Sequence, residues 1–338
     1  MDPGASTLVA YVDAADLWVY DAATDRRRAV TDDGDARFER SPAFLDGACL
    51  AFTNSEPASI ELIELAGQGI RRTIVEEAGW ISDFAINLEQ RSLFYLHIDH
   101  DVDGTYRLKR VGIDGGTPET LHTFNPNLGR GAGSEDEVSV AVSPDGSMLL
   151  VVNTHEYSLE FEFGAIYLFD ADGREIRARL LGTHARWSPD SGTIYFRGHA
   201  GTNGQGWSAL DLESMEATRL GVTPGTNWLV VSPDGRRLAY DTSTFGDSPA
   251  GTQSTGEAPN VYVYDLATGM EAILRRGAMG PLWISSRAVL ATNVRAPGPD
   301  SLNSWESLGT VSRITVGGAR RGVNMTSTLF DTAVLIGT

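Results

Sequence analysis

Three aspartates alternate in the segment Tyr95–Leu108, YLHIDHDVDGTYRL, where Asp99, Asp101 and Asp103 precede Gly104. Carboxylates at this spacing, followed by a glycine that permits a sharp turn, form the first half of a calcium-binding loop. A run of acidic residues is also the ordinary composition of a solvated turn. The segment therefore predicts either a calcium site or an acidic turn.

The continuation of this segment does not match a complete calcium loop. Its ninth and twelfth positions are Arg107 and Arg110, where such a loop carries an oxygen ligand and a bidentate carboxylate. Arginines there must point away from a cation or take its place. A third interpretation is that the aspartates act together with the interleaved His97 and His100.

Histidine and glutamate side chains suggest a second kind of chemistry. Imidazole nitrogens and carboxylates together bind Mn²⁺ or Zn²⁺, which can polarise a substrate or activate water. The candidate catalytic residues are His155, His184, His199 and Arg186. Glu137 and Glu156 are candidate ligand-binding carboxylates. Polar residues of ordinary surface loops are the alternative explanation, and the sequence leaves both open.

His184 and Arg186 alternate with Ala185 in the segment THARW. In a regular strand this alternation directs both side chains to one face, where they could bind an anionic or sugar-like ligand. Arg186 could equally tie neighbouring structural units together. Trp207 and Trp305 follow Gly- and Pro-rich loops and are candidate aromatic platforms for a ligand.

A repeated turn motif indicates the elements that position these residues. SPDG occurs at Ser143–Gly146 and Ser232–Gly235, with the variant SPDSG at Ser188–Gly192, and a short apolar run follows each copy. The aspartates of the three copies are 45 and 44 residues apart. Pro fixes φ, Asp caps the turn and Gly adopts a positive φ, so the motif predicts a tight hairpin rather than a catalytic site.

A second strand pair follows each copy, as in the segment IYLFDADGREIRARL, and no useful stretch shows the period of an amphipathic helix. The chain is therefore expected to be all-β. Four short strands in each unit of this length are typical of the blades of a β-propeller.

Two segments carry a family resemblance: Arg186–Phe196, RWSPDSGTIYF, and Ile166–Asp170, IYLFD. They resemble the PD40, or WD40-like, repeats of the TolB translocation protein and of the propeller domains in prolyl-oligopeptidase-type enzymes. The resemblance spans nearly the whole chain and is strongest from Val138 to Asp265. It implies a β-propeller and leaves the function open, because such propellers are scaffolds, binding modules and enzymes.

We expect one propeller domain over residues 1–338, with seven blades of four antiparallel strands, and with six or eight blades as the alternatives. The strand Thr7–Val12 has the pattern of the second strand of a blade. The C-terminal segment MTSTLFDTAVLIGT could complete that blade and close the ring, which would remove an exposed sheet edge.

Strands A to D of a blade run from the centre outward, so the A–B and C–D turns lie on one face, called the turn face below. The B–C and D–A connections lie on the opposite face, called the loop face. The six histidines map to the loop face or to strand ends beside it, with His122 and His184 just before first strands. Long loops on a rigid scaffold are the usual place for binding.

The resemblance extends to oligogalacturonate lyases, which are seven-bladed propellers with TolB-like repeats and a histidine-coordinated Mn²⁺. Their ligand cluster is not matched here: His97 and His100 are the only close histidine pair, and no glutamine accompanies them. The resemblance therefore carries over the fold alone.

Composition and sequence patterns argue against several other classes of protein. The net charge of −18 and pI near 4.7 disfavour a nucleic-acid partner. No apolar run is long enough to span a membrane, and the N-terminus lacks the pattern of a signal peptide, so we expect a cytoplasmic protein, or a secreted or periplasmic one if a leader was removed. Gly246–Ala250 only approximates the nucleophile elbow of a serine hydrolase.

The sequence favours a binding or scaffold propeller that engages a protein partner or a small molecule on its loop face. The alternative is an enzyme, a metal-assisted lyase, hydrolase or cyclase, with histidines on the same face. If the aspartate segment binds a metal, the metal would be calcium. If the histidines and glutamates bind one, it would be manganese or zinc.

Overall fold

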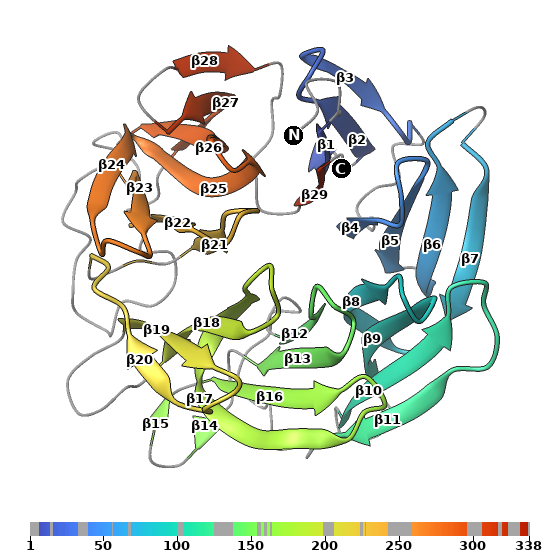
Figure 1. Ribbon diagram of the computed structural model, residues 1–338. Helices are drawn as coiled ribbons and strands as arrows, with labels where there is room; N and C mark the ends of the chain where they lie inside the picture. Colours follow the sequence, from blue (N-terminus) through green and yellow to red (C-terminus); the bar gives the residue numbers. More distant parts are fainter. Residues whose placement is uncertain are drawn as a thin grey trace.

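The computed structural model describes residues 7–13, 16–32, 40–55, 57–66, 69–99, 105–124, 138–153, 157–158, 161–162, 164–198, 206–223, 226, 228–242, 259–295, 306–316, 320–323 and 332–336. Within these ranges the regular elements are all β-strands, arranged in antiparallel sheets around a common centre (Figure 1). The all-β fold predicted from the repeats is therefore confirmed.

Five of the sheets have four strands each. In order from the centre outward, they are β29 (Thr332–Ile336), β1 (Thr7–Asp13), β2 (Asp16–Asp21) and β3 (Arg26–Ala29); β4 (Arg40–Phe44), β5 (Cys49–Ser55), β6 (Ala58–Glu64) and β7 (Arg71–Glu76); β8 (Trp80–Asn87), β9 (Ser92–Asp99), β10 (Thr105–Gly112) and β11 (Glu119–Thr123); β21 (Leu229–Val231), β22 (Arg237–Asp241), β23 (Asn260–Asp265) and β24 (Glu271–Arg276); β25 (Ala278–Ser285), β26 (Ala288–Arg295), β27 (Glu306–Thr315) and β28 (Arg320–Val323).

A seven-stranded sheet lies between these, because one long strand belongs to two units. Its strands are β12 (Val138–Val142), β13 (Met148–Asn153), β16 (Ala165–Asp170), β17 (Glu175–Trp187), β18 (Thr193–Gly198), β19 (Gly206–Asp211) and β20 (Ala217–Arg219). The first part of β17 pairs with β16 as far as Leu181, and the part from Gly182 onward pairs with β18. Counting this sheet as two blades gives the predicted seven, which stays an interpretation. A small hairpin, β14 (Tyr157–Ser158) and β15 (Phe161–Glu162), is separate.

The first and last strands of the chain pair with each other. β1 lies between β29 and β2, with Thr7 opposite Ile336 and Leu8 opposite Leu335. The N-terminal strand is thus the second of its sheet, as its sequence predicts, and the pairing supports the predicted closure of the ring.

The SPDG motif forms the turn that its residue types predict. The Ser143 hydroxyl donates to the Asp145 carboxylate at 2.6 Å, and the same hydroxyl accepts from the Met148 backbone N–H at 2.9 Å. Gly146 has φ +71°, a conformation that suits glycine. Asp190 and Asp234 accept equivalent bonds from Ser188 and Ser232.

The core lies between neighbouring sheets. Leu93 and Tyr95 pack toward the β4–β7 sheet, whereas Phe94 and Leu96 pack toward β12, β13 and β16. Alternate side chains of one strand therefore enter two different cores, which explains why the central residues of the second strands are mostly apolar on both faces.

Hydrogen bonds between first strands also join the units. The indole N–H of Trp187 donates to the carbonyl oxygen of Ala141 at 3.3 Å, and that of Trp283 donates to Val230 at 3.2 Å. None of the described residues forms a helix of the length and apolarity that a membrane crossing requires.

Candidate functional site

Most residues predicted to form the site lie outside the described part of the chain. These are Asp101, Asp103, Glu137, His155, Glu156, His199 and Trp305, and the side chain of Asp99 is also outside it. Their roles stay predictions. His184, Arg186 and Trp207 are described, together with His97 and His122.

The strands that flank the acidic segment limit what kind of calcium loop it can form. β9 ends at Asp99, opposite Thr105 at the start of β10, and Arg110 pairs further along β10 with Phe94. The Arg110 guanidinium donates to the Glu119 carboxylate at 2.8 Å. Residues 105–112 are therefore a strand, so the segment does not form a twelve-residue loop of the EF-hand type.

His97 is buried, with 4% of its surface exposed, and its Nε2 lies 2.6 Å from the carbonyl oxygen of Ala78. The ring thus fastens the connection between β7 and β8. His122 lies in the fourth strand of its sheet, so its predicted position before a first strand was wrong; its ring contacts Phe124 and Phe169 at 4.7 and 5.0 Å between centroids. Nowhere in the described ranges do three histidine, cysteine or acidic side chains gather as a metal site would require.

Trp207 does not form an exposed ligand platform, and this prediction was wrong. Only 1% of its surface is exposed, and its indole N–H points to the carbonyl oxygen of Thr226 at 3.4 Å. The buried residues that pack with it are Tyr195, Leu229, Leu238, Tyr240 and Tyr264. The preceding Gly-rich segment resembled a binding loop, but the residue itself begins a core strand.

The predicted alternation of His184 and Arg186 is interrupted. His184 has φ +54°, and the register between β17 and β18 shifts between Thr183 and Arg186. A bulge of this kind adds a residue to one strand and changes the direction of the side chains around it. The simple strand rule therefore does not place the two side chains together.

Arg186 is the predicted site residue with the clearest surroundings. Its guanidinium carbon lies 5.3 Å from the centre of the Trp228 ring, and its Nη1 donates to the carbonyl oxygen of Ala185 at 2.9 Å. Burial lowers the pKa of Arg186, and the charge of Asp83 opposes this effect. Arginine remains protonated at neutral pH even so. Across the described ranges no carboxylate forms an ion pair with Arg186, so most of its N–H donors have no described partner.

The Asp83 carboxylate also bonds to the backbone of a neighbouring strand. Asp83 Oδ2 accepts a hydrogen bond of 3.0 Å from the Val140 backbone N–H. The neighbouring Ser82 hydroxyl donates to the carbonyl oxygen of Val138 at 2.6 Å. Together these bonds join β8 to β12, the first strand of the next unit.

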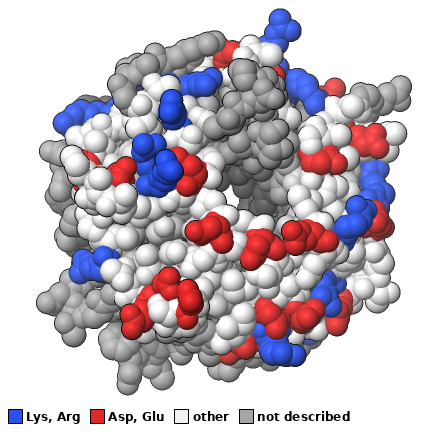
Figure 2. All heavy atoms as spheres, in the orientation of Figure 1, with Lys and Arg blue, Asp and Glu red and all other residues white. Residues whose placement is uncertain are grey.

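Asp83 was not among the predicted site residues, although its place in the repeat is a signal for it. Asp83, His184 and Trp228 each stand four residues before the residue that opens an A–B turn, namely Asn87, Ser188 and Ser232. Equal positions in successive repeats lie at similar heights on the first strands of their units. First strands lie nearest the centre of the molecule (Figure 1), and the space-filling view is hollowed there, with acidic atoms on part of the rim (Figure 2).

This arrangement can bind an anion. A guanidinium supplies two parallel donors to a carboxylate, and an aromatic ring beneath it keeps the fork in one orientation. Partial burial strengthens such a contact by reducing competition from water. We call Arg186, Trp228 and Asp83 the Arg186 site.

Comparison with known proteins shows the fold. No protein-family model and no curated protein sequence matches the chain. The solved structure of an oligogalacturonate lyase in complex with manganese is similar, with a TM-score of 0.64 and 15% identity over 89% of this chain and 82% of the other. A puromycin-hydrolysing peptidase from Mycobacterium tuberculosis has a TM-score of 0.62 and 14% identity, covering 94% of this chain and 53% of the peptidase.

A putative TolB from Agrobacterium tumefaciens is also similar, with a TM-score of 0.51 and 16% identity over 84% of this chain and 94% of the other. Identities this low show a common architecture and leave the activity open. The repeats, the sheets around one centre and these solved structures together identify the fold of the chain as a β-propeller similar to that of the putative TolB.

Proposed function

We propose that the chain is a binding propeller that holds a carboxylate-bearing ligand at the Arg186 site. The observation that carries the proposal is the position of the Arg186 guanidinium, which lies over Trp228 on a first strand and has no carboxylate partner among the described residues. Two described arginines of the turn face are paired by contrast, Arg110 with Glu119 and Arg91 with Asp114.

A sugar acid is the ligand class that fits this site best. Its carboxylate can accept two hydrogen bonds from the guanidinium, and its ring can lie against the exposed part of Trp228. One protein of similar fold is named as a lyase of oligogalacturonate, a polymer of such sugar acids. The overall charge of −18 repels anions over the surface, so a local cation is needed to hold one.

The experiment is a calorimetric titration of galacturonate oligomers into the wild-type chain and Arg186→Gln. Losing charge-assisted hydrogen bonds worth about 1.5–3 kcal/mol should weaken binding by roughly 10- to 100-fold. Arg186→Lys keeps the charge but not the planar fork, so its affinity should lie between the two.

Arg28→Gln is the matched control, because this substitution removes the same charge from the exposed outer strand β3. Galactose, the neutral counterpart of the ligand, should give no signal that depends on Arg186. Equal affinity of the wild type and Arg186→Gln, with both chains folded, would contradict the proposal.

The second candidate is a metal-assisted lyase, which the likeness to the manganese-bound lyase suggests. A lyase would break a glycosidic bond and leave a carbon–carbon double bond in the product. Incubation with galacturonate oligomers and Mn²⁺, followed by ultraviolet absorbance, detects that double bond. Binding without product supports the binding propeller, whereas manganese-dependent product that is lost in His155→Ala and His199→Ala supports the enzyme.

A further inference from the structure

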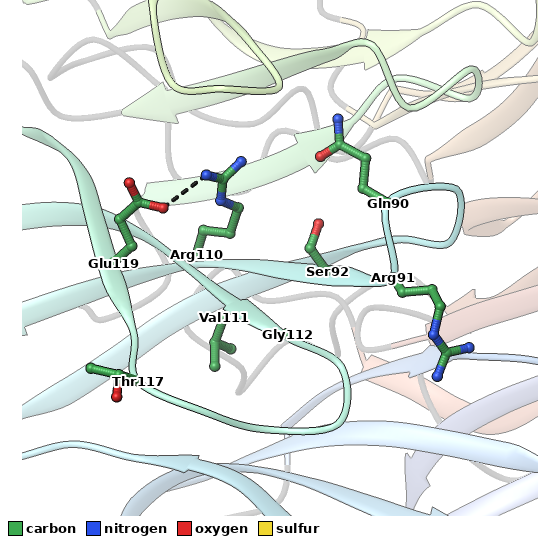
Figure 3. Close-up of a pocket in the computed structure, with 8 residues that line it drawn as sticks. All are labelled: Gln90, Arg91, Ser92, Arg110, Val111, Gly112, Thr117 and Glu119. Carbon is green, nitrogen blue, oxygen red and sulfur yellow. Dashed lines mark hydrogen bonds and ion pairs between the residues drawn. The ribbon is translucent and has the colours of Figure 1, made fainter.

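A polar cavity lies on the turn face of the β8–β11 sheet, and its lining includes none of the residues of the Arg186 site. Its volume is about 280 Å³. The residues that line it are Gln90, Arg91, Ser92, Arg110, Val111, Gly112, Thr117 and Glu119. We call it the Ser92 cavity. It combines the start of β9, the end of β10 and the start of β11 (Figure 3).

Ser92 is the buried polar group of this cavity. Only 6% of the residue is exposed, and its hydroxyl has no hydrogen-bond partner among the described residues. A buried hydroxyl without a partner costs free energy, and such groups are rare in folded proteins. A ligand hydroxyl that displaced the atoms covering the Ser92 hydroxyl and bonded to it would remove this cost.

The space beside Ser92 exists because its partner across the sheet is a glycine. Ser92 pairs with Gly112, which places no side chain on the surface next to the hydroxyl. A Cβ at Gly112 would lie 3.1 Å from the carbonyl oxygen of Gly115, so the turn also disfavours a larger residue there.

The polar ends of four residues point the same way in Figure 3, namely Glu119, Arg110, Ser92 and Gln90, while the Arg91 side chain extends in another direction. Together they offer a carboxylate acceptor, guanidinium donors, a hydroxyl and a carboxamide. Sugar hydroxyls both donate and accept hydrogen bonds, so they complement such a mixed set.

The charges of the cavity do not favour an anion. Arg110 donates to Glu119 at 2.8 Å and to Asp172 at 3.4 Å, so two carboxylates surround one guanidinium. Arg91 is paired with Asp114 at 3.0 Å. The volume of the Ser92 cavity is slightly below that of typical small-molecule sites, so the cavity suits one sugar ring rather than several.

We propose that the Ser92 cavity binds a single neutral sugar residue, with the Ser92 hydroxyl bonded to a hydroxyl of its ring. This site is separate from the Arg186 site in position and in ligand charge. It lies at the junction of two sheets, because Arg110 also donates to the carbonyl oxygen of Ala171 at 3.3 Å.

The test is saturation-transfer NMR of the full chain with D-glucose, D-galactose, D-mannose, L-fucose and N-acetylglucosamine, each added separately. We expect a signal with at least one of them, reduced tenfold or more in Ser92→Ala. Thermal unfolding should occur at the same or a higher temperature in this variant, because the lost hydroxyl has no partner in the protein.

Ser208→Ala is the matched control, since Ser208 is also buried with an unpartnered hydroxyl and does not line the cavity. It should leave sugar binding unchanged. Arg186→Gln should also leave it unchanged, which separates this proposal from the proposed function. Absence of signal with all five sugars, or equal signals in the wild type and Ser92→Ala, overturns the proposal, as does tighter binding of inorganic phosphate to the same residues.

Discussion

The carboxylate of Asp241, in β22, accepts a hydrogen bond of 2.6 Å from the backbone N–H of Gly280, in β25 of the next sheet. Asp241 is fully buried, and Gly280 has φ +60°. The contact resembles that of Asp83 with Val140, which joins β8 to β12. Two pairs of neighbouring sheets are therefore joined by an aspartate that accepts from the backbone of the next first strand.

We expect Asp241→Ala to lower the free energy of unfolding by about 2–3 kcal/mol, because a buried hydrogen bond to a charged group is lost. Urea denaturation followed by tryptophan fluorescence measures the change. The control is Asp211→Ala, in an exposed turn where the carboxylate accepts from the Ser214 backbone N–H at 2.7 Å, and it should lower the free energy of unfolding much less. Equal losses in both variants would contradict the proposed role of the buried contact.

The turn aspartates should make stability depend on pH. The hydroxyl of Ser143 lowers the pKa of Asp145, and that of Ser188 lowers the pKa of Asp190. Because the folded value lies below the unfolded value of about 3.9, the stabilisation is complete above that pH and is lost as pH falls through the folded pKa. The double variant Asp145→Asn, Asp190→Asn should be less stable than the wild type at pH 6 and approach it below about pH 3.

The measurement for this prediction is the urea midpoint as a function of pH. Glu213→Gln is the control, because it removes an exposed carboxylate with no described hydrogen bond. A difference in urea midpoint between the wild type and the double variant that is the same at every pH would show that the stability of the turns does not depend on the aspartate charge.

Lys109, the only lysine of the chain, should react slowly with amine reagents. Its ammonium donates to Glu77 at 2.5 Å, and the two side chains are 14% and 13% exposed. Burial alone would raise the pKa of Glu77, but hydrogen bonds from Lys109 and Tyr95 outweigh it, so the pKa is lowered. Glu77 therefore stays ionised at neutral pH and keeps its bond with Lys109.

Mass spectrometry after brief acetylation should show modification of the N-terminal amine well before Lys109. Glu77→Gln should expose Lys109 to the reagent and lower the free energy of unfolding by about 3 kcal/mol, because it leaves a partly buried charge without its partner. Fast modification of Lys109 in the folded wild type would disprove the buried pair.

Trp207 should contribute to stability and not to binding. Trp207→Ala removes a large core side chain and should cost about 3–5 kcal/mol of unfolding free energy, with Trp207→Phe costing less. Galacturonate affinity of the folded Trp207→Phe chain should equal that of the wild type. A selective loss of binding in this variant would restore the ligand-platform interpretation.

Calcium should bind the acidic segment only weakly. Arg107 and Arg110 stand where a calcium loop has its closing oxygen ligands, and both belong to the strand β10. Because arginine supplies no carboxylate, we expect a dissociation constant of about 0.1–1 mM or weaker. Thermal unfolding of chelator-treated protein at increasing calcium concentrations measures this. The double variant Asp101→Ala, Asp103→Ala should lose the response, and binding in the nanomolar range would contradict the expectation.

The local features follow from residue types and their order along the chain. Ser143, Pro144, Asp145 and Gly146 form their turn through bonds within six residues, so their types and order were sufficient to predict it. The repeat distance then predicted the all-β class, and the strand pattern predicted the place of Thr7–Val12 beside a C-terminal strand.

Which side chains are buried, and which of them make contact, depends on the tertiary structure. Trp207 is buried because residues of the following sheet cover it, and Arg186 lies over Trp228 because two first strands are neighbours in space. Ser92 has open space beside it because its partner across the sheet is Gly112. Each of these facts depends on contacts between residues distant in the chain, which local turn and strand preferences do not specify.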